Sequence, residues 1–163
     1  MNNTKNGQFK CSYSKNTSGL SIKKIVNDER TSLPLGCNDN ASTKVYINSA
    51  KEINLILTET FGDERLKQLL KLNEKFDFLF TLDQDGIPIQ ITFRLNSNTT
   101  MTPEELSLID ERIKKKIRFK VVRDIPCNSP HTNMFFLRIR FDEVLSGEIR
   151  SLKENEEEGK KHW

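Results

Sequence analysis

The strongest constraint on this chain is an alternating apolar pattern that is interrupted by an acidic turn ending in glycine. Residues 76–82 and 87–95 each place an apolar side chain at every second position, and Asp83-Gln84-Asp85-Gly86 lies between them. Side chains alternate between the two faces of a strand, so each run has one apolar face. Asp-Gly tolerates the positive φ angles of a tight turn. The pattern predicts a β-hairpin, with an edge or an irregularity at Pro88 because proline cannot donate a ladder hydrogen bond.

A hairpin alone is marginal in water, and the segment after it supplies a cover. Thr102, Pro103 and Glu105 have the spacing of an N-cap, a proline at the first helical position and a capping box. The apolar residues that follow recur at helical spacing: Leu106, Ile109, Ile113 and Ile117. We expect this helix to pack on the inward-facing side chains of the hairpin, which include Phe78, Phe80, Ile89 and Ile91.

A second helical pattern precedes the hairpin and follows a short β-type run at 44–47. Ser49 and Glu52 have the spacing of a capping box, and apolar residues recur at helical spacing behind them. Gly62-Asp63 interrupts the pattern. We therefore predict either one broken helix over 50–73 or two short helices with a bend at the glycine.

The chain closes with a short strand at 119–123 and a long strand from Met134 to Phe141. One face of the long strand is apolar and consists of Phe135, Leu137, Ile139 and Phe141. The other face combines aromatic and cationic side chains, a composition that suits contact with a protein or a nucleic acid. The candidate partner-binding residues are those of this second face: Met134, Phe136, Arg138 and Arg140.

These elements predict an α+β fold, in which an antiparallel sheet made of the hairpin and the closing strand is covered by two helices. We expect a single domain over 44–141, because most of the apolar residues of the 163-residue chain lie there. Residues 1–43 lack sustained periodicity and are expected to form a loosely ordered arm, with at most one strand docked on the domain. Residues 142–163 are expected to form a charged C-terminal tail, solvated over 154–161.

The order of helix, hairpin with an Asp-Gly turn, helix and strand resembles the C-terminal domain of the energy-transducing protein TonB. The resemblance lies in residues 78–89, in the helix from Leu106 to Phe119 and in the strand from Met134 to Phe141, and it covers about residues 50–141. The layout also resembles small exported Bacteroidetes-type proteins of unknown function. The resemblance implies a binding module in which the last strand, or its neighbour, pairs with an incoming extended peptide.

No catalytic, cofactor or metal constellation is recognisable in the sequence. Cys127 and His131 have the spacing of half a metal site but lack two further ligands. Asp83, Asp85 and Gly86 resemble the start of a calcium loop, but a strand follows where a bidentate glutamate would be needed. Glycine-rich phosphate loops and serine-nucleophile motifs are absent. We therefore expect neither enzymatic activity nor a bound cofactor or metal.

The cysteines and the N-terminus leave the compartment open. Cys11, Cys37 and Cys127 are widely spaced and contain no Cys-x-x-Cys pair, so free thiols or one disulfide with a thiol left over both fit. The resemblance implies export to the periplasm or beyond, whereas a natural start at Met1 would place the protein in the cytoplasm. No stretch approaches the ~20 apolar residues that span a bilayer, so no transmembrane segment is expected.

The charge balance bears on the partner. Lys and Arg number 26 and Asp and Glu number 23, which argues against a dedicated nucleic-acid binder. We therefore expect a protein or peptide partner, bound by strand addition at an exposed sheet edge. The alternative is binding to a nucleic acid or an anionic surface through the basic run Lys114–Lys120 together with Arg138 and Arg140. Partner identity and oligomeric state do not follow from the sequence.

Overall fold

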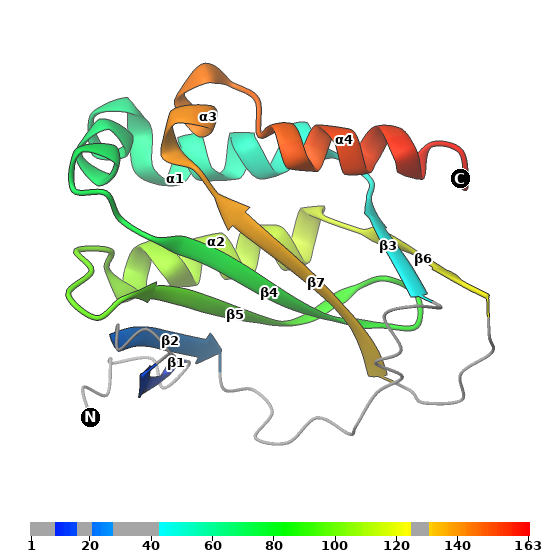
Figure 1. Cartoon of the computed structure of the whole chain (residues 1–163), viewed down its shortest axis with the longest axis horizontal. Coiled ribbons are helices and arrows are strands. Elements are labelled where there is room, and N and C mark those ends of the chain that lie inside the picture. Colours follow the sequence, from blue (N-terminus) through cyan, green and yellow to red (C-terminus); the bar gives the residue numbers. More distant parts are fainter. Residues whose placement is uncertain (1–8, 16–20, 28–42, 125–130) are drawn as a thin grey trace.

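The computed structural model describes the backbone of residues 9–15, 21–27, 43–124 and 131–163, and the side chains of 43–124 and 135–163. These residues form an α+β fold with a five-stranded antiparallel sheet, ordered β1-β2-β5-β4-β7, and a two-stranded sheet of β3 and β6 (Figure 1). The strands are β1 (Phe9–Lys15), β2 (Ser21–Asn27), β3 (Thr43–Ile47), β4 (Phe76–Asp83), β5 (Pro88–Asn96), β6 (Phe119–Arg123) and β7 (His131–Ile139). The helices are α1 (Ala50–Lys71), α2 (Pro103–Lys116), α3 (Phe141–Ser146) and α4 (Arg150–Gly159).

The predicted hairpin is confirmed as β4 and β5, and its turn is fixed by Asp83. The Asp83 carboxylate accepts hydrogen bonds from the backbone N–H groups of Asp85 and Ile87, at 2.9 and 2.8 Å. Gly86 has a φ of 77°. The register shifts after Thr81, so Leu82 pairs with Pro88 and Ile89 falls in the irregularity. Ile89, which the alternation places on the core face, is therefore only half-buried, and the irregularity expected at Pro88 is present.

Both predicted covering helices are present, and they lie together on one face of the sheet (Figure 1). The Thr102 hydroxyl and Glu105 form the expected capping box at the start of α2. Gly62 interrupts α1 with a non-helical φ of 70° and ψ of 162°, as the bend at this position predicts. The helices bury the aromatic face of the hairpin completely, and four phenylalanine side chains have no exposure: Phe76, Phe78, Phe80 and Phe93.

The segment 142–163, expected to be a charged tail, instead forms α3 and α4 and contributes to the core. Within 154–161, the part expected to be solvated, most residues are exposed, but Asn155 and Glu156 are half-buried and Gly159 is buried. Three of its apolar side chains are buried, namely Val144, Ile149 and Leu152. Asn155 bonds twice to the backbone of β3, accepting from Ile47 N at 2.8 Å and donating to Val45 O at 3.0 Å. Glu156 accepts from the N–H of Ala50 at the start of α1, at 2.8 Å. The charged sequence of α4 therefore forms a helix that docks on the domain.

The N-terminal arm contributes two strands rather than one. β1 pairs with β2, and β2 pairs with β5 from Ile22 opposite Asn96 to Val26 opposite Thr92. The hairpin sequence alone left β5 as a possible edge, and β2 occupies that position. Cys37 and Cys127 lie outside the described residues, and only the backbone of Cys11 is described. Within the described part of the chain, no helix is both long and apolar enough to cross a membrane.

Candidate functional site

Strand β7 forms one end of the five-stranded sheet. It pairs with β4 from Phe76 opposite Ile139 to Asp83 opposite His131, with a register shift near the last pair. Within the described residues, no strand pairs with its other side. Along an antiparallel strand, alternate residues turn their N–H and C=O groups toward opposite neighbours. The outer side of β7 therefore carries a row of backbone donors and acceptors that no described strand pairs with, although β3 contacts part of β7. An unpaired row of this kind is the feature that allows another strand to add.

The two faces of β7 are those predicted from the alternation. Leu137 and Ile139 are buried in the core at 3% and 4% exposure. Phe136 is 46% exposed, and the side chains of Arg138 and Arg140 are 61% and 64% exposed. Three of the four candidate residues thus lie together on the outer face. The fourth, Met134, pairs with Thr81 through its backbone, and its side chain lies outside the described part.

Phe136 lies between two guanidinium groups that come from different strands. The Cζ atoms of Arg94 on β5 and Arg138 on β7 are each 5.9 Å from the centre of its ring. Such cation–π contacts hold a cation over an aromatic face by about 0.5–1 kcal/mol at an exposed site. They favour an orientation in which the exposed ring of Phe136 lies beside the two guanidinium groups.

Arg138 also neutralises a buried carboxylate. Asp77 on β4 is only 1% exposed, and it accepts from Arg138 Nε at 2.9 Å and from Nη2 at 3.3 Å. Lys75 Nζ lies 3.6 Å from the same carboxylate. A buried charge needs a paired charge and hydrogen bonds to be tolerated. The hydrogen bond with Asp77 raises the pKa of Arg138 above its ordinary value, so this guanidinium remains charged.

Arg140 repeats the arrangement one position further along the same face. It donates to Asp142 from Nε at 3.3 Å and from Nη2 at 3.0 Å. This hydrogen bond raises the pKa of Arg140 and lowers that of Asp142. Both arginines are therefore held through the Nε–Nη2 edge of the guanidinium. Among the described residues, the Nη1 atom of neither arginine has a hydrogen-bond partner.

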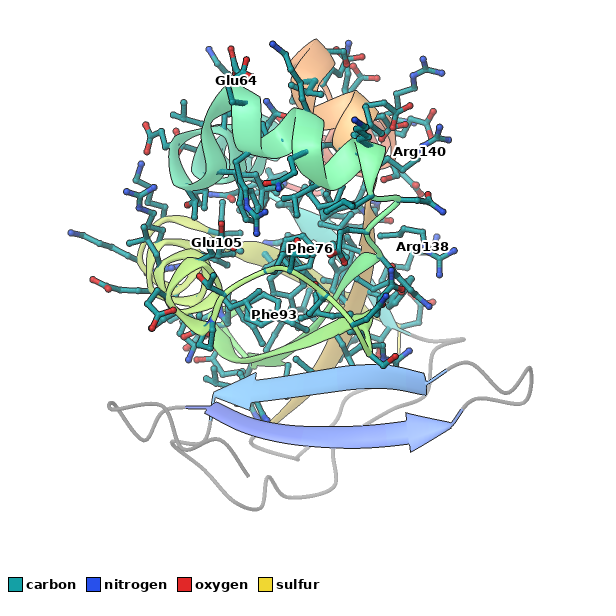
Figure 2. The ribbon with its side chains drawn as sticks, turned by 90° about the vertical axis from the view of Figure 1, so that its left-hand side faces the viewer. Glu64, Phe76, Phe93, Glu105, Arg138 and Arg140 are labelled. Atoms are coloured by element: carbon teal, nitrogen blue, oxygen red, sulfur yellow. The ribbon has the colours of Figure 1, made fainter. Side chains whose placement is uncertain are left out.

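A groove of about 670 Å³ adjoins this arginine pair. It opens where α1 and β5 end, where β4 begins and where β7 passes into α3. Its floor is apolar and includes Phe76 and Phe141, while Leu70, 43% exposed, lies on its wall. Arg138 and Arg140 line it, and both side chains extend from the same side of the molecule, away from the core phenylalanines Phe76 and Phe93 (Figure 2).

The groove is close to electrically balanced. It is lined by the cations Lys75, Arg138 and Arg140 and by the carboxylates of Glu74, Asp77 and Asp142. One oxygen of Glu74 accepts from the N–H and the hydroxyl of Thr100, at 2.7 and 3.1 Å. With Arg94 beside Phe136, the outer face of β7 and its groove carry an excess of one positive charge.

Sequence reasoning missed Asp77, Arg94 and Leu70 as members of this surface. Asp77 and Arg94 stand at outward positions in the alternation of β4 and β5, and this was the available signal. Their place beside Arg138 and Phe136 depends on the cross-strand register, with Asp77 opposite both Arg94 and Arg138. Leu70 belongs to the surface because α1 ends beside the sheet, and no local sequence pattern predicts where α1 ends relative to the sheet.

The structure does not bring the basic run Lys114–Lys120 together with Arg138 and Arg140. Lys116 is 3.5 Å from Glu52 at the start of α1, whereas the two arginines line the groove beside Leu69 and Leu70 at its end. Lys114 pairs with Asp110 at 3.0 Å, and Lys120 lies over the ring of Trp163 at 5.8 Å. The cations of the alternative site are therefore separated by the length of α1 and partly engaged within the fold.

The other residues considered as metal ligands are not joined by further ligands in the described part of the chain. His131 lies in β7 opposite Asp83, and Cys127 is outside the described residues. Asp83 stabilises the hairpin turn, as described above. In the described part of the chain, no group of three or more His, Cys, Asp or Glu side chains is placed to hold a metal ion.

Comparison with known proteins gives only distant structural likenesses. No family model and no curated protein matches the sequence. The fold is similar to the crystal structure of a DUF5043 family protein from Bacteroides uniformis. That likeness has a TM-score of 0.49 and 11% sequence identity, and it covers 80% of this chain and 84% of the other.

Proposed function

We propose that this protein is a non-enzymatic binding module that takes up an extended segment of another protein as an additional strand along β7. The observation that carries the proposal is the unpaired outer side of β7 in the described sheet, next to exposed Phe136 and the arginine pair. Backbone hydrogen bonds give affinity in this mode of recognition, and the alternate side chains of the strand give specificity.

The element order supports the same mode. The order α1, β4, β5, α2, β6 and β7 keeps the sequence of helix, hairpin, helix and closing strand on which the resemblance to the TonB C-terminal domain rests, with β6 added before the closing strand. We propose a TonB-like use of the last strand, and with it an exported location, in which a partner in the same compartment supplies the segment. β2 pairs with β5 on one side of the hairpin, and β1 pairs with β2. The unpaired side of β7 therefore lies at the opposite end of the sheet, and Arg138 and Ile139 of β7 line the groove.

Site-specific photo-crosslinking in cells tests the proposal. A photoreactive phenylalanine analogue at Phe136 places the reactive group on the outer face of β7, where the exposed ring already tolerates an aromatic side chain. Leu108 on α2 is 37% exposed and serves as the matched control position. We expect a discrete protein adduct from position 136 and none from position 108, with the partner residues belonging to one extended segment.

Equal adducts from both positions, or none from 136, would contradict strand addition at β7. The alternative function gives a different result: binding through Lys114–Lys120 would produce nucleic-acid or lipid association that weakens steeply as salt is raised. Substituting Lys115 and Lys116 by glutamine would abolish that association and leave the β7 adduct unchanged. The two experiments together therefore separate the two candidates.

A further inference from the structure

The positions of Arg138 and Arg140 indicate the charge of the partner strand that would bind along β7. We infer that the partner segment carries acidic side chains at every second position, facing Arg138 and Arg140. This inference rests on the proposed strand addition and specifies the partner class.

Arg138 is in β7, and Arg140 follows with extended φ and ψ angles of −109° and 118°, so both side chains leave the same face. Two residues along a strand rise by about 6.6 Å. A strand that pairs with β7 has the same repeat, so side chains two positions apart on it meet the two arginines in turn. Carboxylates at adjacent positions would lie on opposite faces of the added strand.

Asp77 and Asp142 each engage the Nε–Nη2 edge of one guanidinium. These contacts hold the arginines in place, and among the described residues Nη1 of each has no hydrogen-bond partner. Guanidinium and carboxylate form charge-assisted hydrogen bonds that are stronger than neutral ones. An incoming carboxylate therefore meets two oriented cations at little cost in side-chain ordering.

A basic partner segment is disfavoured at this surface. The cations Arg94, Arg138, Arg140 and Lys75 exceed the carboxylates Glu74, Asp77 and Asp142 by one, and Asp77 and Asp142 are already paired with Arg138 and Arg140. A basic side chain facing the arginines would add a like charge, and like charges opposite one another in a sheet are destabilising. Phe136, two positions before Arg138, offers an apolar ring to the neighbouring side chain of the added strand.

The test uses synthetic peptides of about ten residues, long enough to span the nine residues of β7 and Arg140. One alternates Val and Glu, a second has the same composition with the Glu residues side by side, and a third alternates Val and Gln. Binding is measured by calorimetry with the full chain, and hydrogen exchange reports protection of the β7 amides. We expect the alternating Val-Glu peptide to bind about tenfold tighter than either other peptide.

Arg140→Gln is the test variant because both Arg140 and Asp142 are well exposed, so the fold tolerates the change. It should remove most of the preference for Glu over Gln. Arg150→Gln is the matched control, since Arg150 is exposed on α4 and its loss changes the net charge equally. We expect this control to alter binding by less than about twofold.

The possible results distinguish a failure of the acidic preference from a failure of the proposed strand addition. Equal affinity for the Glu and Gln peptides, with β7 amides protected by both, overturns the acidic preference and leaves strand addition standing. A preference that survives Arg140→Gln, or that falls equally with Arg150→Gln, also overturns it. If no peptide protects the β7 amides, the proposed function fails together with the inference.

Discussion

At the scale of single residues, the Asp77–Arg138 pair combines a structural and a surface role. Asp77 is buried although it points to the outer face, and its carboxylate is paired with Arg138 and, at 3.6 Å, with Lys75. The sequence supplied Arg138 as a candidate from the alternation of β7 alone. Its partner could not be predicted, because the pairing of Asp77 with Arg138 requires the register between strands 61 residues apart.

Arg138→Gln tests this pairing. Removing one partner of a buried pair leaves an uncompensated charge, but Arg138 is mostly exposed and Lys75 remains nearby, which reduces the cost. We expect a loss of about 1–2 kcal/mol in the free energy of unfolding, measured by urea denaturation. Adding Asp77→Asn should restore part of that loss, since the buried charge disappears. Additive losses in the double variant would show that the two side chains act independently.

Tyr46 gives a second prediction at the residue scale. Its side chain is 2% exposed, and its hydroxyl donates to Glu158 at 3.3 Å. Burial raises its pKa above the ordinary value, and the nearby Glu158 charge and hydrogen bond add to the effect. In a Tyr13→Phe background, the absorbance of tyrosinate should appear only above about pH 10 for the folded protein and near that value after unfolding.

The sign of the stability effect follows from the same shift. Folding favours neutral Tyr46, so its contribution is fully present below the unfolded pKa and is lost as pH rises through the higher folded pKa. Tyr46→Phe should therefore flatten part of the fall in stability on the alkaline side. A folded-state titration of Tyr46 that coincides with the unfolded one would be incompatible with this assignment.

At the scale of elements, the hairpin and α2 were predictable because each carries its own local instructions. The Asp83 turn, the Thr102 capping box and the spacing of the apolar residues all lie within one segment. α4 was not predictable in the same way. It buries Leu152 and Gly159, and its docking depends on Asn155 bonding to the backbone of β3, 110 residues earlier in the chain. A charged sequence of this kind carries no local sign of its partner.

Two glycines have similar backbone angles but different surroundings. Comparing their alanine variants therefore distinguishes the cost of backbone strain from the cost of disturbed packing between elements. Gly86 and Gly147 have φ values of 77° and 87°, which cost a non-glycine residue about 1 kcal/mol at either position. A Cβ at Gly86 would lie 1.8 Å from the carbonyl oxygen of Phe119, whereas one at Gly147 meets nothing within 4 Å. Gly86→Ala must therefore also push β6 away from the hairpin turn.

We expect Gly147→Ala to lower the free energy of unfolding by about 1 kcal/mol and Gly86→Ala by about 3 kcal/mol or more. Thermal or urea unfolding of the two variants measures the difference directly. The same loss in both would mean that the turn is not pressed against Phe119 and that β6 docks less closely than described.

At the scale of the whole molecule, the sequence located the centre of the domain and misplaced its ends. Most of the buried apolar residues lie within 44–141, but the sheet extends into the N-terminal arm through β2, and the core extends into the C-terminal segment through α3 and α4. The outer face of β7 was predictable from alternation. The groove was not, because it forms where α1, β4, β5, β7 and α3 meet.

Truncation after Phe141 tests whether the C-terminal segment belongs to the folding unit. It would remove the buried side chains Val144, Ile149 and Leu152, each stabilising by roughly 1.5–3 kcal/mol, and the bonds of Asn155 and Glu156 to β3 and α1. A domain of this size has a total stability of about 5–15 kcal/mol, so the loss is comparable with the whole. We expect the truncated chain to lose cooperative thermal unfolding and dispersed amide resonances.

The matched control removes only His162 and Trp163. His162 stacks on Tyr46 at 5.1 Å, and Trp163 is 59% exposed, so their removal takes little from the core. This variant should unfold cooperatively within a few degrees of the full chain. A chain ending at Phe141 that unfolds as cooperatively as the control would make α3 and α4 an appendage. Because α3 starts directly after Arg140 and lines the groove through Phe141 and Asp142, that result would also detach the groove from the fold that supports β7.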